Sequence, residues 1–227
     1  VKTITGLQPG TSYQFKVRGY ADDDGETVYG AFSEPYTVET AQPIPVVMLS
    51  TSKVTKTTTT LQWTAIPEAD GYLIYGSRCG TDVKRLKTIQ NGDATMWTKQ
   101  NLDTGRYYKY YVAAYRLVNG KKVIQTTSPM IHVATTGSSY TNPKGITVSA
   151  SSITMKKGTT QALKAAVQLP MGKKVNPHCG EIRYKSSDKT IAKITANGEI
   201  KGVNPGKCTI YVYTQNGLYK TVTVTVL

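Results

Sequence analysis

Residues 102–115 read LDTGRYYKYYVAAY, and an Asn119-Gly120 pair follows a few positions later. Every second residue along this stretch suits a core, namely Tyr108, Tyr110, Val112 and Ala114. A period of two is typical of a strand that buries one face. The Asn-Gly pair accepts the positive backbone angles of a tight hairpin, so we expect a partner strand to run back through Val123.

The same skeleton occurs 95 positions earlier, where residues 7–20 read LQPGTSYQFKVRGY and Asp24-Gly25 follows. A repeat at a long fixed period indicates an array of similar modules. The acidic stretch at residues 22–26 resembles a calcium loop superficially, but it lacks the ligand spacing of an EF-hand. Because it aligns with the plain turn at residues 117–121, we interpret it as a hairpin tip.

A tyrosine corner is predicted at Tyr108, which opens its strand six residues after Leu102. In such a corner the ring lies in the core and the hydroxyl group bonds backbone across the loop. On these residues, both copies resemble the second half of a fibronectin type III domain. The phrase LQPGTSY at residues 7–13 is close to that family's usual phrase, whereas the second copy lacks the proline.

Two further phrases extend this resemblance across the middle of the chain. Trp63, in an alternating Leu-x-Trp strand, is expected to anchor a core, and Gly-Tyr-x-Ile-Tyr follows at residues 71–75. The resemblance implies the C-terminal part of one such module at residues 1–41, with strands at 2–5, 13–20 and 28–40, and a whole module at residues 43–137. Proline-containing linkers are expected at residues 41–45 and 136–143.

A different pattern begins after the second linker. Its short alternating strands and Asn-Gly turns again predict a sandwich. The phrases Ser-Ser-Asp at residues 186–188, Asn-Gly-x-Ile at 197–200 and Gly-x-x-Thr-Ile at 206–210 follow one another in order. Together they resemble bacterial immunoglobulin-like domains of group 2, the type seen in invasin- and intimin-like surface proteins, over residues 145–227. The fold class predicted for the chain is therefore all-β, with tandem immunoglobulin-like β-sandwich modules.

The positive charge of the chain is spread unevenly. The formal net charge of +14 comprises −3 in residues 1–42, +7 in residues 43–140 and +10 in residues 141–227. Such a field favours anionic partners, and a solvated lysine-rich surface is the alternative interpretation. Neither a recognition helix nor an RNP-like motif accompanies the charge, so no nucleic-acid partner is predicted. No apolar run approaches the length of about 18 residues that would predict a membrane span.

The sequence predicts no catalytic, cofactor or metal site. His132 is expected on a terminal strand and His178 in a loop, and no nucleophile elbow, phosphate-binding loop or zinc-protease motif is present. The cysteines lack the paired CxxC spacing of a structural zinc site. Cys79 has no partner in its own module, whereas Cys179 and Cys208 share the last module and allow either a disulfide or two free thiols.

One face of the strand at residues 107–115 is a candidate binding surface. If Tyr108 and Tyr110 face inward, four residues face outward and are joined by one from the neighbouring strand: Tyr107, Lys109, Tyr111 and Tyr115, with Tyr75. Tyrosines beside lysine can stack on sugar rings or bind a partner. The alternative is aromatic pairing between strands, which only stiffens the sheet.

Taken together, these resemblances imply a non-catalytic modular segment of a bacterial secreted or cell-surface protein, extracellular and monomeric. By resemblance, such arrays act as adhesive or spacer stalks, and the partners are a cell-wall polymer, a glycan or a partner surface protein. The alternative is the accessory carbohydrate-binding tail of a secreted hydrolase. We also expect further residues before Val1 and a natural end at Leu227.

Overall fold

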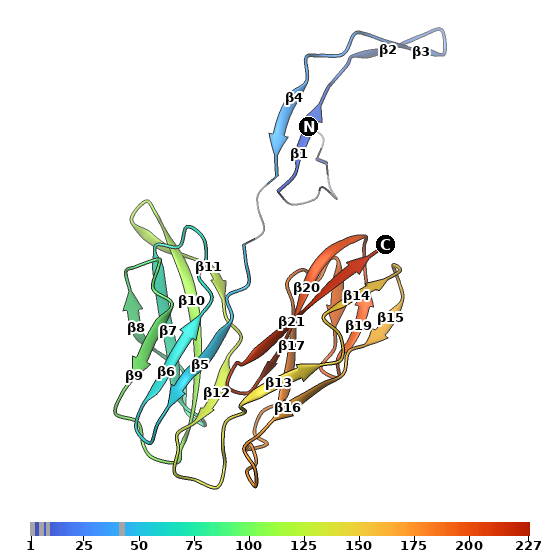
Figure 1. Cartoon of the computed structure of the whole chain (residues 1–227). Helices are drawn as coiled ribbons and strands as arrows, with labels where there is room; N and C mark the ends of the chain where they lie inside the picture. Colours follow the sequence, from blue (N-terminus) through green and yellow to red (C-terminus); the bar gives the residue numbers. More distant parts are fainter. Residues whose placement is uncertain (1–2, 5–6, 8–9, 41–43) are drawn as a thin grey trace. The chain divides into compact units, whose positions relative to one another are not determined.

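The computed structural model describes residues 3, 4, 7, 10–40 and 44–227. These residues form the strands β1–β21 and, within that part of the chain, no helix (Figure 1). The predicted all-β class is therefore confirmed. The chain divides into two compact units, Val1–Ile44 and Pro45–Leu227. Across the described residues, nothing helical is long and apolar enough to cross a membrane.

The first unit contains two antiparallel pairs, in which β1 pairs with β4 and β2 with β3. Its strands are β1 (Ser12–Phe15), β2 (Tyr20–Asp23), β3 (Glu26–Tyr29) and β4 (Tyr36–Glu39). Asp24 and Gly25 have φ of 49° and 87°, which confirms the hairpin tip. The single strands predicted at residues 13–20 and 28–40 are each interrupted. The interruptions lie beside Gly19 and Gly30. The backbone N–H of Gly30 donates a hydrogen bond to the carbonyl oxygen of Gly19 at 2.9 Å. Glycine within a strand weakens it.

Two predictions for this part of the chain fall partly outside the described residues. Of the strand expected at residues 2–5, Lys2 and Thr5 lie outside them, and the described Thr3 and Ile4 are not in a strand. Of the linker expected at residues 41–45, the positions 41–43 likewise lie outside them.

The second unit begins with a two-sheet sandwich, here called the middle sandwich. One sheet has the order β5-β6-β9, and the other β11-β10-β7-β8 with β12 also paired to β10. In Figure 1 these strands run from cyan to yellow-green. Their bounds are β5 (Leu49–Val54), β6 (Thr59–Trp63), β7 (Gly71–Arg78), β8 (Lys84–Ile89), β9 (Met96–Lys99), β10 (Tyr107–Val118), β11 (Lys121–Thr127) and β12 (Ile131–Ala134).

The predicted alternation along β10 places every second side chain in the core between these sheets. Tyr110, Val112 and Ala114 are almost completely buried there. Tyr108 is buried beside them, and its hydroxyl oxygen accepts a hydrogen bond from the backbone N–H of Asp103 at 2.8 Å. The predicted tyrosine corner is therefore confirmed, and so are the core position of Trp63 and the tight turn at Asn119-Gly120, whose φ values are 51° and 73°.

The last sandwich, which runs from yellow to red in Figure 1, has its own core. Its main sheet has the order β14-β21-β20-β17, in which β14 and β21 are parallel; β15-β19-β18 and β13-β16 form two smaller sheets. The strands are β13 (Gly145–Val148), β14 (Ser152–Met155), β15 (Thr160–Ala162), β16 (Ala165–Gln168), β17 (Ile182–Ser186), β18 (Ala192–Ile194), β19 (Glu199–Gly202), β20 (Gly206–Thr214) and β21 (Tyr219–Val226).

Candidate functional site

The middle and last sandwiches meet in a joint that is built around the turn between β20 and β21. Asn216 in this turn is 3% exposed. Its side-chain amide donates to Thr51 Oγ1 and to the carbonyl oxygen of Pro143, each at 3.2 Å. The backbone carbonyl oxygen of Asn216 accepts a hydrogen bond from the backbone N–H of Thr51 at 3.1 Å. A single residue of the last sandwich is thus bonded to the first strand of the middle sandwich and to the linker.

Gly217 lets this turn approach the middle sandwich closely. Its φ is +86°, a conformation that disfavours other residues. A Cβ atom at this position would collide with the carbonyl oxygen of Leu49 and lie 2.9 Å from a methyl carbon of Ile131. Only glycine therefore fits between β5 and β12 without a shift of backbone.

Arg183, on β17, also forms hydrogen bonds at the joint between the middle and last sandwiches. Its guanidinium group donates to the carbonyl oxygen of Met130 at 2.6 Å and to that of Gln215 at 3.2 Å. The group also lies 4.8 Å from the ring centre of Tyr213. Hydrogen bonds from a charged donor are the stronger kind, worth about 1.5–3 kcal/mol each. Arg183 is therefore a second fixed point between the sandwiches.

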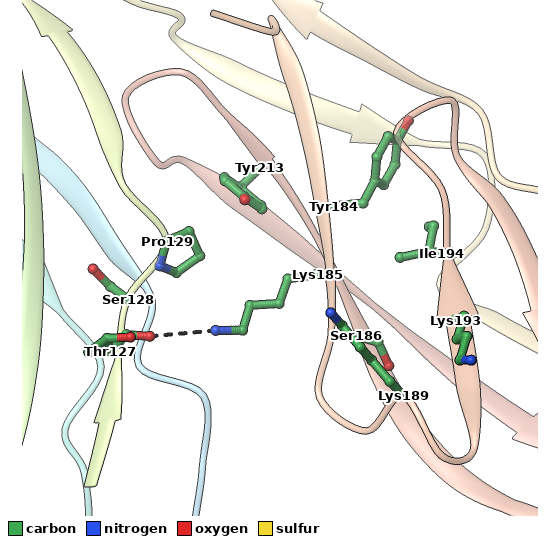
Figure 2. Close-up of a pocket in the computed structure, with 10 residues that line it drawn as sticks. All are labelled: Thr127, Ser128, Pro129, Tyr184, Lys185, Ser186, Lys189, Lys193, Ile194 and Tyr213. Atoms are coloured by element: carbon green, nitrogen blue, oxygen red, sulfur yellow. Dashed lines mark hydrogen bonds between the residues drawn. The ribbon is translucent and has the colours of Figure 1, made fainter. Parts of the chain in front are cut away.

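A hollow of about 400 Å³ lies beside these contacts. Figure 2 shows Lys185 reaching across it, with its ammonium group 3.5 Å from the carbonyl oxygen of Thr127. Burial and the nearby charge of Lys189 lower the pKa of Lys185. The hollow is lined by Thr127, Ser128, Pro129, Tyr184, Lys185, Ser186, Lys189, Lys193, Ile194 and Tyr213. Three lysines and no carboxylate among these lining residues favour an anionic group.

A second hollow, of about 540 Å³, opens beside Tyr107 at the start of β10. Its lining residues are Arg78, Cys79, Gly80, Gly105, Arg106, Tyr107, Ser138, Ser139, Tyr140, Asn176 and His178. Beside it, Nδ1 of His132 lies 2.9 Å from Nε2 of His178 and 3.5 Å from Sγ of Cys79. These three ligand-type atoms lie within 4.8 Å of one another. No carboxylate belongs to this cluster among the described residues.

Sequence reasoning missed this cluster. The strand register places Cys79 and His132 on the two sides of β10, because His132 is opposite Lys109 and the N–H of Cys79, just after β7, donates to the carbonyl oxygen of Tyr107. That part was accessible from the expected pairing of strands in the middle sandwich. His178 comes from the last sandwich, and no signal in the sequence indicates which residues the joint brings into contact.

The structure does not gather the five predicted binding residues on one exposed surface. Tyr75 and Tyr111 are opposite each other in the register and stack with ring centres 4.7 Å apart and planes 7° apart. This is the aromatic pairing that was the alternative interpretation. Tyr107 packs edge-on against Tyr140 and His178 at the joint. Lys109 lies between these groups on the same face of β10, half-buried.

Tyr115 does not have the predicted exposure. It is 1% exposed and belongs to a small cluster with Leu73 and Ala113. The register of β10 shifts between Ala114 and Tyr115, and the Tyr115 hydroxyl group donates to the carbonyl oxygen of Ile89 at 3.4 Å. Its ring covers Gly71, where a Cβ would collide with it. The ring therefore offers no face for stacking on a sugar.

The cysteines are all free. Cys208 is buried in the core of the last sandwich, 4.0 Å from the hydroxyl oxygen of Ser186. Cys179 lies in the loop before β17 and is half-buried. The disulfide that the sequence allowed between Cys179 and Cys208 is therefore not formed, and the alternative of free thiols is the one observed.

Comparison with known proteins supports the resemblance of the last sandwich. Residues 143–226 match the family model described as bacterial Ig-like domain (group 2). Among solved structures, the chain is similar to the solution structure of the fibronectin type-III domain of human fibronectin type III domain containing protein 3. The identity is 22%, the TM-score is 0.33, and the similarity covers 42% of this chain and 87% of that chain. No curated protein sequence matches the chain.

Proposed function

We propose that the chain is a non-catalytic modular segment of a bacterial secreted or cell-surface protein, and that it acts as a spacer stalk. Its modules are the C-terminal part of a fibronectin type III-like module at residues 1–41, a whole one at 43–137 and a bacterial immunoglobulin-like module at 145–227. The match of residues 143–226 to a bacterial domain family supports the extracellular, bacterial setting.

The buried Asn216-Gly217 turn is the observation that carries the spacer role. A spacer must hold its two ends apart, so a joint between its modules has to resist bending. Bending at this joint would break the bonds of Asn216 to Thr51 and Pro143 and would withdraw Gly217 from its place against Leu49. Each such hydrogen bond is worth about 0.5–1.5 kcal/mol, and an unpaired buried group costs more.

Residual dipolar couplings measured by NMR on the chain test this role. If the joint is stiff, couplings from residues 45–135 and 143–227 fit one common alignment tensor. Gly217→Ala forces a side chain against β5, so we expect its couplings to require two separate tensors. Gly120→Ala is the matched control. Like Gly217, Gly120 follows an asparagine and has a positive φ, but no atom lies within 4 Å of where its Cβ would be. Two tensors for the unmodified chain would rule out a stiff spacer.

Adhesion to anionic wall polymers is a second candidate, favoured by the hollow that contains Lys185, Lys189 and Lys193. Retention on purified cell walls that falls as salt rises would support it. We expect the double variant Lys189→Ala/Lys193→Ala to lose most of this retention, with Lys53→Ala/Lys56→Ala as the charge-matched control. Retention that is insensitive to salt, or equal in both double variants, would contradict the proposal.

Carbohydrate binding by the outer tyrosines, as in the tail of a hydrolase, has weaker support. Tyr75 and Tyr111 already cover one face of each other's ring, and Tyr115 is buried. A glycan panel probed with the unmodified chain and with Tyr111→Ala tests this role. Equal binding by the two proteins would exclude it.

A further inference from the structure

Three side chains with metal-binding atoms converge where the two sandwiches of the second unit meet. They are Cys79 and His132 from the middle sandwich and His178 from the last sandwich. Thiolate and imidazole are the ligands that zinc prefers in proteins. The two imidazoles and the thiol come from segments that are far apart in sequence, so local spacing does not explain their convergence.

Separate backbone contacts hold each of these side chains in place. The N–H of Cys79 donates to the carbonyl oxygen of Tyr107 at 2.9 Å, and that of His132 donates to the carbonyl oxygen of Gln215 at 2.7 Å. The side-chain amide of Gln215 donates to the carbonyl oxygens of Asn176 and Cys179 at 2.7 and 3.0 Å, which fixes the loop that carries His178. The ligand atoms are therefore positioned by the fold of both sandwiches.

The two separations made by His132 are close to those around a tetrahedral zinc ion, whereas the third pair, Cys79 and His178, is known to lie within 4.8 Å. Zinc–nitrogen bonds of about 2.0–2.1 Å and zinc–sulfur bonds of about 2.3 Å place two nitrogens about 3.3 Å apart and a nitrogen about 3.6 Å from a sulfur. The distance from Cys79 Sγ to His132 Nδ1 is 3.5 Å. The two imidazole nitrogens are 2.9 Å apart, so they need to separate by only about 0.4 Å to admit the ion.

We propose that Cys79, His132 and His178 bind one zinc ion, which cross-links the middle and last sandwiches. The donor set selects zinc against calcium and magnesium, which prefer oxygen ligands. Cys179, which follows His178 directly in the same loop, is one candidate for the fourth ligand, and a water molecule is the other. This site does not depend on the spacer role, since an ion can join two modules whatever they do.

The electrostatics of the cluster favour one ligand and oppose another. Burial lowers the pKa of His132 to about 4, so its imidazole is neutral and able to bind a metal at neutral pH. Burial raises the pKa of the Cys79 thiol to about 11, so zinc must displace its proton. Lys109 and Arg183 add positive charge nearby, which the negative thiolate offsets in part.

Titration of the chelator-stripped, reduced chain with zinc and with cobalt(II) tests the site. We expect one ion per chain by calorimetry, and a cobalt(II) visible spectrum with the intensity of tetrahedral coordination and a sulfur-to-metal charge-transfer band. Cys79→Ser, His132→Gln and His178→Gln should each weaken zinc binding by at least about 10–100-fold, the loss that changing an outer-shell partner alone produces. Cys208→Ala, which removes a thiol elsewhere, should leave zinc binding unchanged.

His178 keeps the test independent of folding, because it is exposed in a loop and its replacement leaves both cores intact. Zinc should raise the midpoint of thermal unfolding of the unmodified chain but not that of His178→Gln. Cys179→Ser then identifies the fourth ligand, since a loss of cobalt(II) charge-transfer intensity assigns it to Cys179 and an unchanged spectrum assigns it to water. The proposal is overturned if zinc does not bind, or if it binds and stabilises His178→Gln as well as it does the unmodified chain.

Discussion

Residues 12–39 and residues 107–134 share the same sequence skeleton, yet corresponding apolar side chains are exposed in the first stretch and buried in the second. Val17 is 72% exposed, whereas its counterpart Val112 is 0% exposed. Tyr20 is 76% exposed, whereas Tyr115 is 1% exposed. Equal periodicity thus gives equal strand tendency but not equal burial. Burial depends on what the rest of the module places against the strand.

The difference lies in the second sheet. In the middle sandwich, β5-β6-β9 lies against β10 and supplies core residues such as Leu61 and Trp63. Within the described part of the first unit, the strands form only two-stranded pairs. A two-stranded pair is marginally stable in water because it has no opposing apolar surface to bury. Among its described residues, the first copy therefore has the local pattern of the module but no second sheet packed against it.

The largest expected difference is in amide hydrogen exchange. Amides of β10 open only with global unfolding, which at about 5–15 kcal/mol slows exchange by roughly 10⁴-fold or more. Amides of β1 and β4 should open locally and show little protection. Exchange followed by NMR or mass spectrometry on the chain measures both at once. Comparable protection in the two copies would mean that the first unit has a stable core of its own, contrary to the exposure of its side chains.

A smaller but more specific difference is expected for Tyr20 and Tyr115, which occupy corresponding positions in the two copies of the repeat. Tyr115→Ala empties a buried site and should lower the free energy of unfolding of the middle sandwich by about 3–5 kcal/mol. Tyr20→Ala, the same change at the corresponding position of the first copy, should change it by less than about 0.5 kcal/mol. Urea denaturation followed by tryptophan fluorescence reports this sandwich, because Trp63 and Trp97 both lie in it. Equal losses would show that the first copy stabilises the second.

Local chemistry made much of the fold predictable. Alternation identified the buried face of β10, and the Leu102 to Tyr108 spacing identified a tyrosine corner whose hydrogen bond is present at 2.8 Å. The Asn-Gly pair at residues 119–120 identified a hairpin. The last sandwich was predictable for the same reason, since its strands also alternate between short turns. Each of these features depends on residues that are close together in sequence.

What could not be predicted depends on contacts over long distances in the chain. Tyr115 was expected to face solvent, because a strand period cannot show that Leu73 packs against the ring or that Gly71 leaves space beside it. The approach of His178 to His132 was missed because it depends on how the turn at Asn216 seats against the middle sandwich. A sequence pattern describes single modules, whereas a joint is set by surfaces that only the folded modules possess.

The smallest expected effect concerns the tyrosine corner itself. Tyr108→Phe keeps the buried ring and removes only the hydroxyl oxygen that accepts from the N–H of Asp103. The loss should be about 1 kcal/mol in the free energy of unfolding, measured by urea denaturation, which is the net worth of one such hydrogen bond. Tyr111→Phe, on the half-buried outer face of the same strand, is the matched control and should stay within about 0.5 kcal/mol of the unmodified chain. If Tyr108→Phe were equally silent, the corner would add nothing to the second copy, and burial of the rings alone would separate it from the first.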